Sequence, residues 1–206
     1  LRKIPTKKAS VNNAVNFLSE NALKTLLTEP DLTTLKGFRN MFYMILLYDS
    51  GARNSELLNL RLKDVDLTPG RSRISVIGKG NKERKIFLTP AAKKSLSDFL
   101  VIRNAMNVPT NALFISRNKK RITTRAIQDV VKKYVALAGL DKNAISPHKL
   151  RHTSATLMYK YGHVDIRSLQ MILGHESVAT TEIYTHIDES QLQAAVNSNP
   201  LAMMFS

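Results

Sequence analysis

The sequence predicts an α+β fold that is mainly α, a helical bundle with a small antiparallel β-sheet on one side. Apolar residues recur at helical spacing over most of the chain. A single stretch, residues 71–89, switches to two β-rich runs around a glycine-containing turn. The 206 residues contain no internal repeat, and a composition of 43% hydrophobic and 23% charged residues is that of an ordinary globular domain.

The N-terminal half contains most of the predicted helical core. Residues 1–12 are basic and lack an apolar period, so they are interpreted as a linker. Helices are predicted over 17–27, with Ser19 as N-cap, over 35–51 and over 53–65. The helix over 35–51 is the most apolar of the three and ends at a glycine.

The second half begins with the hairpin predicted at residues 71–89, where "ISVI" and "KIFL" flank Gly-Lys-Gly-Asn-Lys. Helices are expected over 90–105 and 123–138, with a short apolar strand over 113–116 between them. Further helices are expected over 148–161, 165–173, about 177–185 and about 188–197.

The charge balance favours a polyanionic partner. Thirty-one Lys and Arg against 16 Asp and Glu give a formal charge of +15, with a pI near 10.1. No apolar run approaches the roughly 18 residues needed to span a bilayer, so nucleic acid is expected and a membrane is not. The absence of cysteine excludes disulfides and thiolate metal sites. The chain begins with Leu and has no signal-peptide pattern, so a fragment that lacks its natural N-terminal part is expected.

The stretch "HKLRH" at 148–152 allows three interpretations. His148 and His152 have the i, i+4 spacing of a zinc pair, but Lys149 and Arg151 place two cations beside the ion. His148 and Arg151, at i and i+3, combine an imidazole with a bidentate guanidinium, which suits a phosphodiester. Pro147 fits a first helical turn, whose unpaired N–H groups attract anions. A solvated basic helix start remains the third interpretation.

Three other motifs are weak individually. Arg53 lies at a helix start one turn before Glu56, and an Arg there requires an anion or a carboxylate. Lys79 lies between two glycines at the hairpin tip. His175 follows a glycine C-cap and precedes Tyr184, whose alternative role is core packing. The cations of the hairpin outnumber its one acid, Glu83, and predict a surface for backbone phosphates made by Arg71, Arg73, Lys79, Lys82, Arg84 and Lys85.

Taken together and in order, these motifs resemble the active-site signature of the tyrosine recombinases, the phage-integrase and Xer family. The resemblance covers the chain from about residue 13 and includes "GARNSEL", "IGKGNKER", "HKLRHTSAT" and "LGHESVATTEIYTHI". It implies the tyrosine recombinase catalytic-domain fold. It also implies a catalytic set made of Arg53, Lys79, His148, Arg151, His175 and the nucleophile Tyr184.

The resemblance implies cleavage and rejoining of DNA strands through a 3′-phosphotyrosyl intermediate, without metal, ATP or another cofactor. A phenol with a pKa of about 10 needs a proton acceptor as it attacks phosphorus, and His148 is expected to be that acceptor. Arg53, Arg151 and His175 are expected to stabilise the phosphate charge, and Lys79 to protonate the leaving 5′-oxygen. Glu56 and His152 are expected in supporting roles, and Lys149 is expected to face DNA or solvent.

The family also implies a layout and partners. Residues 1–12 resemble the linker to a missing N-terminal core-binding domain, 13–187 form the catalytic domain, and 188–206 form a tail helix that docks in cis or in trans. The expected partners are double-stranded DNA with a specific recombination site and further copies of the chain. These copies would form a synaptic tetramer on DNA from free monomers, with accessory DNA-bending or directionality factors. A cytoplasmic, DNA-associated protein of bacterial, phage or mobile-element origin is expected.

Several functions share this signature. Integration and excision of a mobile element or phage is the main expectation, and Xer-type chromosome dimer resolution is the alternative within the family. A type IB topoisomerase uses nearly the same side chains to relax DNA. A catalytically silent DNA-binding module with the same fold is a further alternative.

Overall fold

The computed structural model describes residues 18–141, 145–162 and 164–184. This part of the chain divides into two compact units, with the division inside one helix, between Ser154 and Ala155. The α-helices are α1 Glu20–Thr28, α2 Leu35–Ser50, α3 Asn54–Asn59, α4 Pro90–Ala105, α5 Thr124–Leu137, α6 Pro147–Lys160 and α7 Ile166–Leu173. The short 3₁₀ helices are η1 Leu62–Asp64, η2 Lys79–Asn81, η3 Val178–Thr180 and η4 Glu182–Tyr184.

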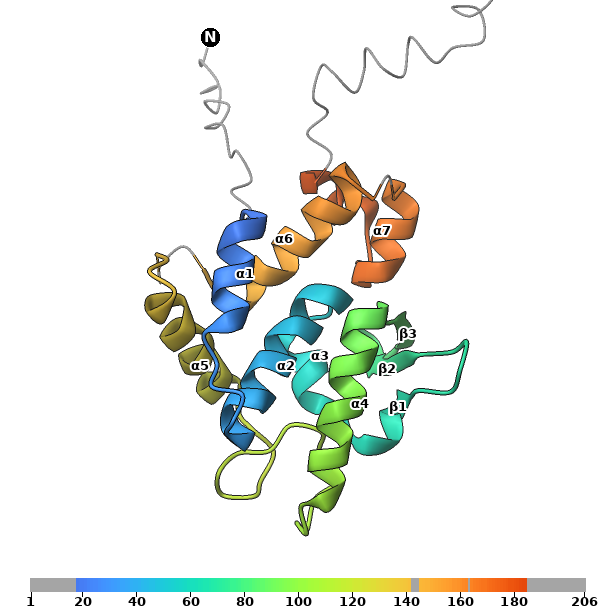
Figure 1. Cartoon of the computed structure of the whole chain (residues 1–206). Helices are drawn as coiled ribbons and strands as arrows, with labels where there is room; N and C mark the ends of the chain where they lie inside the picture. The colour runs from blue at the N-terminus through green and yellow to red at the C-terminus, as the bar shows by residue number, and fades with distance from the viewer. Residues whose placement is uncertain (1–17, 142–144, 163, 185–206) are drawn as a thin grey trace, which may run out of the picture. The chain divides into compact units, whose positions relative to one another are not determined.

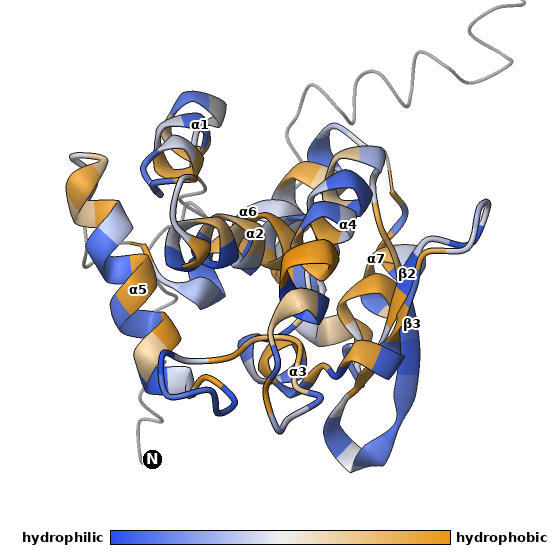
Figure 2. Ribbon diagram, turned by 60° about the horizontal axis from the view of Figure 1, so that its bottom comes forward, coloured by the Kyte–Doolittle hydropathy of each residue, from blue (hydrophilic) through white to orange (hydrophobic). Residues whose placement is uncertain are grey.

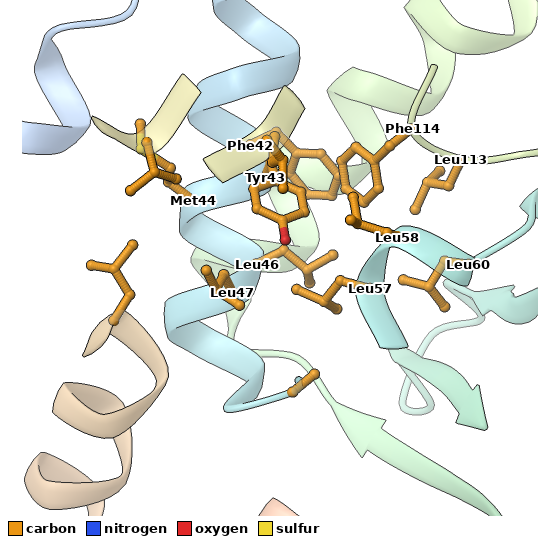
Figure 3. Packing of buried hydrophobic residues seen from close by; sticks show 14 of the residues in the cluster. Phe42, Tyr43, Met44, Leu46, Leu47, Leu57, Leu58, Leu60, Leu113 and Phe114 are labelled. Atoms are coloured by element: carbon orange, nitrogen blue, oxygen red, sulfur yellow. The ribbon is translucent and has the colours of Figure 1, made fainter. Parts of the chain in front are cut away.

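Helix α2 forms the centre of the first unit, with α4 on one side and α1 and α5 on the other (Figure 1). Its sequence is apolar on several faces, and Phe42, Tyr43, Met44, Leu46 and Leu47 are fully buried. Phe42 stacks on Phe99 of α4 and on Phe114, with ring centroids 5.0 and 5.6 Å apart. Figure 3 shows Phe42 and Phe114 within this core. Such aromatic pairs add about 0.5–1.5 kcal/mol beyond area burial, so they fix α4 against α2.

Capping residues define where the helices begin and end. Side-chain oxygens of Ser19, Thr34, Thr89 and Thr123 accept N–H groups at the starts of α1, α2, α4 and α5. Helix α2 ends at Gly51, which adopts a left-handed conformation with φ 54°. Helix α5 shows alternating polar and apolar residues along its length (Figure 2), as expected for a helix with one face on the core.

The sheet has three antiparallel strands in the order β1 Val65–Asp66, β2 Arg73–Ile77 and β3 Glu83–Phe87. The predicted hairpin is therefore confirmed, and β1 adds an edge strand that the sequence did not indicate. Ile74 pairs with Ile86, and Val76 pairs with Arg84. Because Ile74, Val76 and Ile86 are buried, these pairs define the core-facing side of the hairpin.

Three of the predicted elements are wrong in detail. Residues 113–116 form no strand, because Leu113 N–H bonds to Leu60 and the Phe114 carbonyl bonds to Ile122, so no continuous ladder develops. The helix predicted over 53–65 stops at Asn59, where Leu60 turns to an extended conformation. The helix predicted over 177–185 is replaced by η3 and η4. The helix predicted over 188–197 lies outside the described residues.

The second unit is small. Its core consists of Ala155, Leu169 and Leu173, with Met158, Tyr159 and Val164 packed against them. Asp165 caps α7 by accepting the N–H groups of Arg167 and Ser168. Gly174 ends α7 in a left-handed conformation with φ 63°, which directs the chain towards His175. Within the described residues, the range predicted as the catalytic domain, 13–187, thus contains two hydrophobic cores.

Candidate functional site

Arg53 is the N-cap residue of α3, and Glu56 lies one turn further on. The Arg53 backbone N–H donates to Glu56 Oε2 at 2.6 Å, and Arg53 Nη1 donates to Oε1 at 2.9 Å. An arginine at a helix start is disfavoured by the helix dipole, and the Glu56 carboxylate supplies the negative charge that compensates it. Tyr43 Oη donates to Asn54 Oδ1 and ties the same helix start to α2.

Helix α6 begins at Pro147 and places His148 and Arg151 one turn apart. Ser146 Oγ accepts the Lys149 N–H at 3.2 Å and so caps the helix. The His148 ring is exposed, whereas Arg151 is only 4% exposed. Arg151 Nη1 donates to the Gly51 carbonyl at 2.5 Å, which attaches α6 to the turn that leads into Arg53.

A cavity of about 360 Å³ lies where these helix starts meet, and Arg53, His148 and Arg151 line it together with Asn54, Ser55, Thr124, Gln128, Ser146 and Pro147. Two guanidinium groups, an imidazole and the starts of α3 and α6 border one space of a size that accepts a phosphodiester. Thr124 and Gln128 of α5 were not predicted as site residues. No motif marks them, because α5 approaches the cavity only in the folded chain.

Lys79 lies in the turn of the hairpin and does not line this cavity. Its side chain is exposed. The turn contains Gly80 at φ 71° and Asn81 at φ 58°, two positive φ angles as in a type I′ turn. The Gly78 N–H donates to the Lys82 carbonyl at 2.9 Å and closes the turn.

His175 and Tyr184 belong to the second unit. His175 Nδ1 shares a hydrogen bond of 2.9 Å with Oγ1 of Thr181, and Thr181 is fully buried. The carbonyl of His175 accepts a hydrogen bond from Gln170 Nε2 at 3.1 Å. Tyr184 is the last residue of η4. Thr181 was not predicted from the sequence, because a threonine six residues after a candidate histidine is no signal in itself.

The predicted DNA-binding residues fall into different environments. Arg71, Lys82 and Lys85 are exposed, and Lys149 is half-buried. Two others contact carboxylates: Arg73 Nη2 lies 3.2 Å from Asp66 Oδ2, and Arg84 forms two bonds to Glu56. The hairpin carries largely hydrophilic residues along β3 (Figure 2).

The pKa values of Glu56 and His152 are both lowered, but burial opposes the shift of Glu56 and contributes to that of His152. Burial alone would raise the pKa of Glu56, but hydrogen bonds from Arg84 and Arg53 outweigh it and hold that pKa below its ordinary value. Burial, with the charges of Lys149 and His148, lowers the pKa of His152. The rings of His148 and His152 lie 6.4 Å apart, and no group of three or more His, Asp or Glu suited to a metal occurs among the described residues.

Residues 16–191 match the phage integrase family. This chain belongs to that family. It is 43% identical over 205 residues to tyrosine recombinase XerC of Caldanaerobacter subterraneus subsp. tengcongensis, a match that covers 98% of this chain and 55% of the relative. It is 38% identical to tyrosine recombinase XerC of Actinobacillus pleuropneumoniae serotype 7, over 92% of this chain and 64% of that protein. The chain thus spans between 55% and 64% of the length of these two family members.

Solved structures of family members show the same fold. The crystal structure of XerA recombinase has a TM-score of 0.76 and 36% identity, over 90% of this chain and 65% of that one. XerH site-specific recombinase bound to its difH substrate has a TM-score of 0.77 and 28% identity, over 95% of this chain and 57% of that one. The expected tyrosine recombinase catalytic-domain fold is therefore confirmed. No described helix is both long and apolar enough to span a bilayer.

Proposed function

We propose that this chain is the catalytic part of a site-specific DNA recombinase that cleaves and rejoins strands through a 3′-phosphotyrosyl link. The observation that supports it best is the cavity bordered by Arg53, His148 and Arg151. The exposed cations of the hairpin and the formal charge of +15 suit a DNA partner. The XerH relative is bound to a difH DNA substrate, which supports the same assignment.

In the proposed cleavage step, Tyr184 Oη attacks phosphorus as the bond from phosphorus to the 5′-oxygen breaks. His148 accepts the phenolic proton and Lys79 donates a proton to the leaving oxygen. Arg53 and Arg151 bind the two non-bridging oxygens, whose negative charge grows in the transition state. With Nδ1 held by Thr181, His175 would direct Nε2 to the same phosphate.

Rejoining reverses these transfers. The 5′-hydroxyl of a partner strand attacks the phosphotyrosyl link, the new phosphodiester forms, and the tyrosine regains its proton. The link conserves the bond energy of the original phosphodiester, so the proposed reaction needs neither ATP nor metal. Glu56 orients Arg53 in this scheme, and His152 supports α6.

The proposal extends to the whole protein. Residues 1–12 would connect to a core-binding domain, 13–187 would form the catalytic domain, and 188–206 would dock on this or a neighbouring protomer. Monomers would assemble as a tetramer on two recombination sites, with accessory DNA-bending or directionality factors. The setting would be the bacterial cytoplasm. Integration or excision of a mobile element is the main task proposed, and chromosome dimer resolution is the second candidate because the matched relatives are Xer proteins.

The test uses a pool of nicked duplexes with a randomised central sequence, incubated with the protein in excess chelator. Covalent adducts are isolated on denaturing gels, and their DNA is sequenced to recover the preferred site. We expect an adduct from the parent chain and none from Tyr184→Phe, with DNA affinity changed by less than about threefold because a phenolic hydroxyl makes few of the phosphate contacts.

The recovered site then separates the alternatives. Mixing two DNAs that carry it should give recombinant product, whereas relaxation of supercoiled DNA without exchange would indicate a topoisomerase. An adduct formed by Tyr184→Phe would refute the nucleophile assignment. An adduct that forms without chelator but not in excess chelator would support the metal interpretation of His148 and His152. Binding without any adduct would indicate a silent DNA-binding module.

A further inference from the structure

Arg84 lies on the core-facing side of β3, unlike its neighbour Lys85. It pairs with Val76 in the register of the hairpin and shares its side of the strand with Ile86, and both residues are buried. The Arg84 side chain is 16% exposed, whereas Lys85 is exposed on the opposite side. The strand alternation therefore separates two cations that the sequence places in one basic surface.

The Arg84 guanidinium forms a bidentate, end-on ion pair with the carboxylate of Glu56. Nη1 donates to Oε1 at 2.6 Å and Nη2 donates to Oε2 at 2.9 Å. The Glu56 side chain is only 3% exposed, and its two oxygens also accept the backbone N–H and Nη1 of Arg53. One buried carboxylate thus holds two arginines that lie 31 positions apart in the chain, through charge-assisted bonds with a fixed geometry.

The Arg84 guanidinium is oriented by its bonds to Glu56 and leaves its own Nε without a partner among the described residues. Its Nε is buried and has no hydrogen-bond partner in the described structure, which is a cost that folded proteins usually avoid. Rotating the guanidinium to bond Nε would sacrifice one of the two bonds to Glu56. The geometry therefore favours orientation of the carboxylate over complete pairing of the arginine.

The ion pair also lies close to the beginning of the Lys79 turn. A Cβ placed on Gly78 would lie 3.4 Å from Glu56 Oε1 and 3.7 Å from Arg84 Nη1. A side chain at position 78 would therefore reach van der Waals contact with the pair, and Lys79 is the next residue. Arg84, Glu56 and Arg53 form one continuous set of contacts within the first unit, and the start of the turn lies beside it.

We propose that Arg84 is a positioning residue for the phosphate site: by clamping Glu56 it fixes Arg53 and the start of the Lys79 turn. The inference rests on the proposed function, because the placement of Arg53 and Lys79 affects cleavage only if these residues act on the scissile phosphate. The positioning role is proposed in place of a direct contact between Arg84 and a DNA phosphate, which the basic hairpin led us to expect.

The two roles predict different defects. For Arg84→Ala on the recovered site, we expect the rate of adduct formation at saturating DNA to fall about 100-fold, since misplacement of about 1 Å has effects of that size. The DNA dissociation constant should change by less than about threefold, because no phosphate contact is lost. Arg84→Lys should give an intermediate rate, because an ammonium cannot bond both oxygens in the same geometry.

Matched variants provide the comparison. Lys85→Ala removes the neighbouring cation from the exposed face and should weaken DNA binding. Lys94→Ala removes an exposed cation from α4, where it pairs with Asp98, and should leave rate and affinity unchanged. Adding n-propylguanidinium should restore part of the Arg84→Ala rate, whereas it should not affect Lys94→Ala. Weaker binding by Arg84→Ala with an unchanged saturated rate would overturn the proposal.

A readout without catalysis separates this inference from the proposed function. The Arg53 amide is bonded to Glu56, so its hydrogen-exchange protection, measured by NMR, should fall about tenfold in Arg84→Lys and stay unchanged in Lys94→Ala. Unchanged protection in Arg84→Lys would overturn the inference even if the enzyme cleaves DNA. If the parent chain forms no adduct, the proposed function fails and the amide measurement still decides the role of Arg84. If Arg84→Ala does not fold, Arg84→Lys decides both measurements.

Discussion

The properties of Glu56 follow from its burial between two arginines. A carboxylate with 3% side-chain exposure is stable only when its charge is paired, and its partners come from a helix start and a strand. "ARNSE" indicates the bond to Arg53, since residues three apart on a helix are neighbours. The bond to Arg84 was not predictable from sequence, because it depends on which face of β3 turns inward.

Replacing Glu56 by Gln should lower the free energy of unfolding at pH 7 by about 3 kcal/mol, because it leaves the partly buried Arg84 without its counter-charge. The folded-state pKa of Glu56 lies below the ordinary value of 4.5. Its contribution is therefore fully present above about pH 4.5 and is lost as the pH falls through the folded-state pKa. Urea unfolding between pH 3 and pH 7 should show the difference between parent and variant shrinking in acid. Asp98→Asn, which alters an exposed ion pair, should change stability by less than about 0.5 kcal/mol at either end.

Thr181 has a specific role in the orientation of His175. Thr181→Val keeps the shape of the side chain but removes the hydroxyl that bonds Nδ1. On the proposed function, the rate of adduct formation at saturating DNA should fall about tenfold, because an unheld imidazole adopts its productive orientation less often. Thr181→Ser retains the hydroxyl and should retain most of the rate. Equal rates for the valine and serine variants would contradict this role.

At the scale of elements, the sequence predicts those with strong periodicity and clear caps. Helices α2, α4, α5 and α7 lie within a residue or two of their predicted ends, because Thr34, Thr89, Thr123 and Asp165 cap them. The segment over 113–116 was misassigned because its apolar side chains are buried by several neighbours. An apolar run of that length does not distinguish a strand from an irregular buried segment.

The hairpin turn depends on Gly80. Its φ of 71° is unfavourable for residues with a Cβ, and nothing lies within 4 Å of the position where a Cβ would be placed. Gly80→Ala should therefore lower the free energy of unfolding by about 1 kcal/mol through backbone strain alone. Gly80→Asn should cost less, because asparagine tolerates this conformation. Urea unfolding of the two variants measures both values, and an alanine variant as stable as the parent would exclude the strain.

At the scale of the whole molecule, the sequence motifs predicted the fold, but not how the candidate site residues divide between the two units. Arg53, Lys79, His148 and Arg151 belong to the first unit, whereas His175 and Tyr184 belong to the second. This division inside α6 was not predictable, because helical periodicity continues without a break through "HTSATLMYK". The candidate motifs were recognisable in the sequence because each combines a reactive side chain with a local glycine or helix signal.

The charge of the molecule predicts a strong effect of salt on DNA binding. Each phosphate contact contributes about 0.9 to the slope of log affinity against log salt concentration. Lys85→Ala should reduce the magnitude of this slope by about 0.9, the contribution of one contact. Arg84→Ala should leave the slope unchanged, because Arg84 already neutralises Glu56. Fluorescence anisotropy between 50 and 200 mM salt, the range over which such contacts dominate affinity, measures both slopes. Equal reductions of the slope in the two variants would indicate that Arg84 contacts a DNA phosphate.

The two faces of β3 carry neighbouring cations in different electrostatic environments. Lys85 projects outward, where a polyanion would pull on it, and Arg84 projects inward to the carboxylate beneath Arg53. A substitution at Arg84 therefore alters the ion pair on the inner face of the strand, whereas one at Lys85 alters only charge that is exposed on the outer face. On the proposed function, the outer face of this strand would add to DNA affinity, while the inner face would keep the Arg53 guanidinium in place beside the cavity.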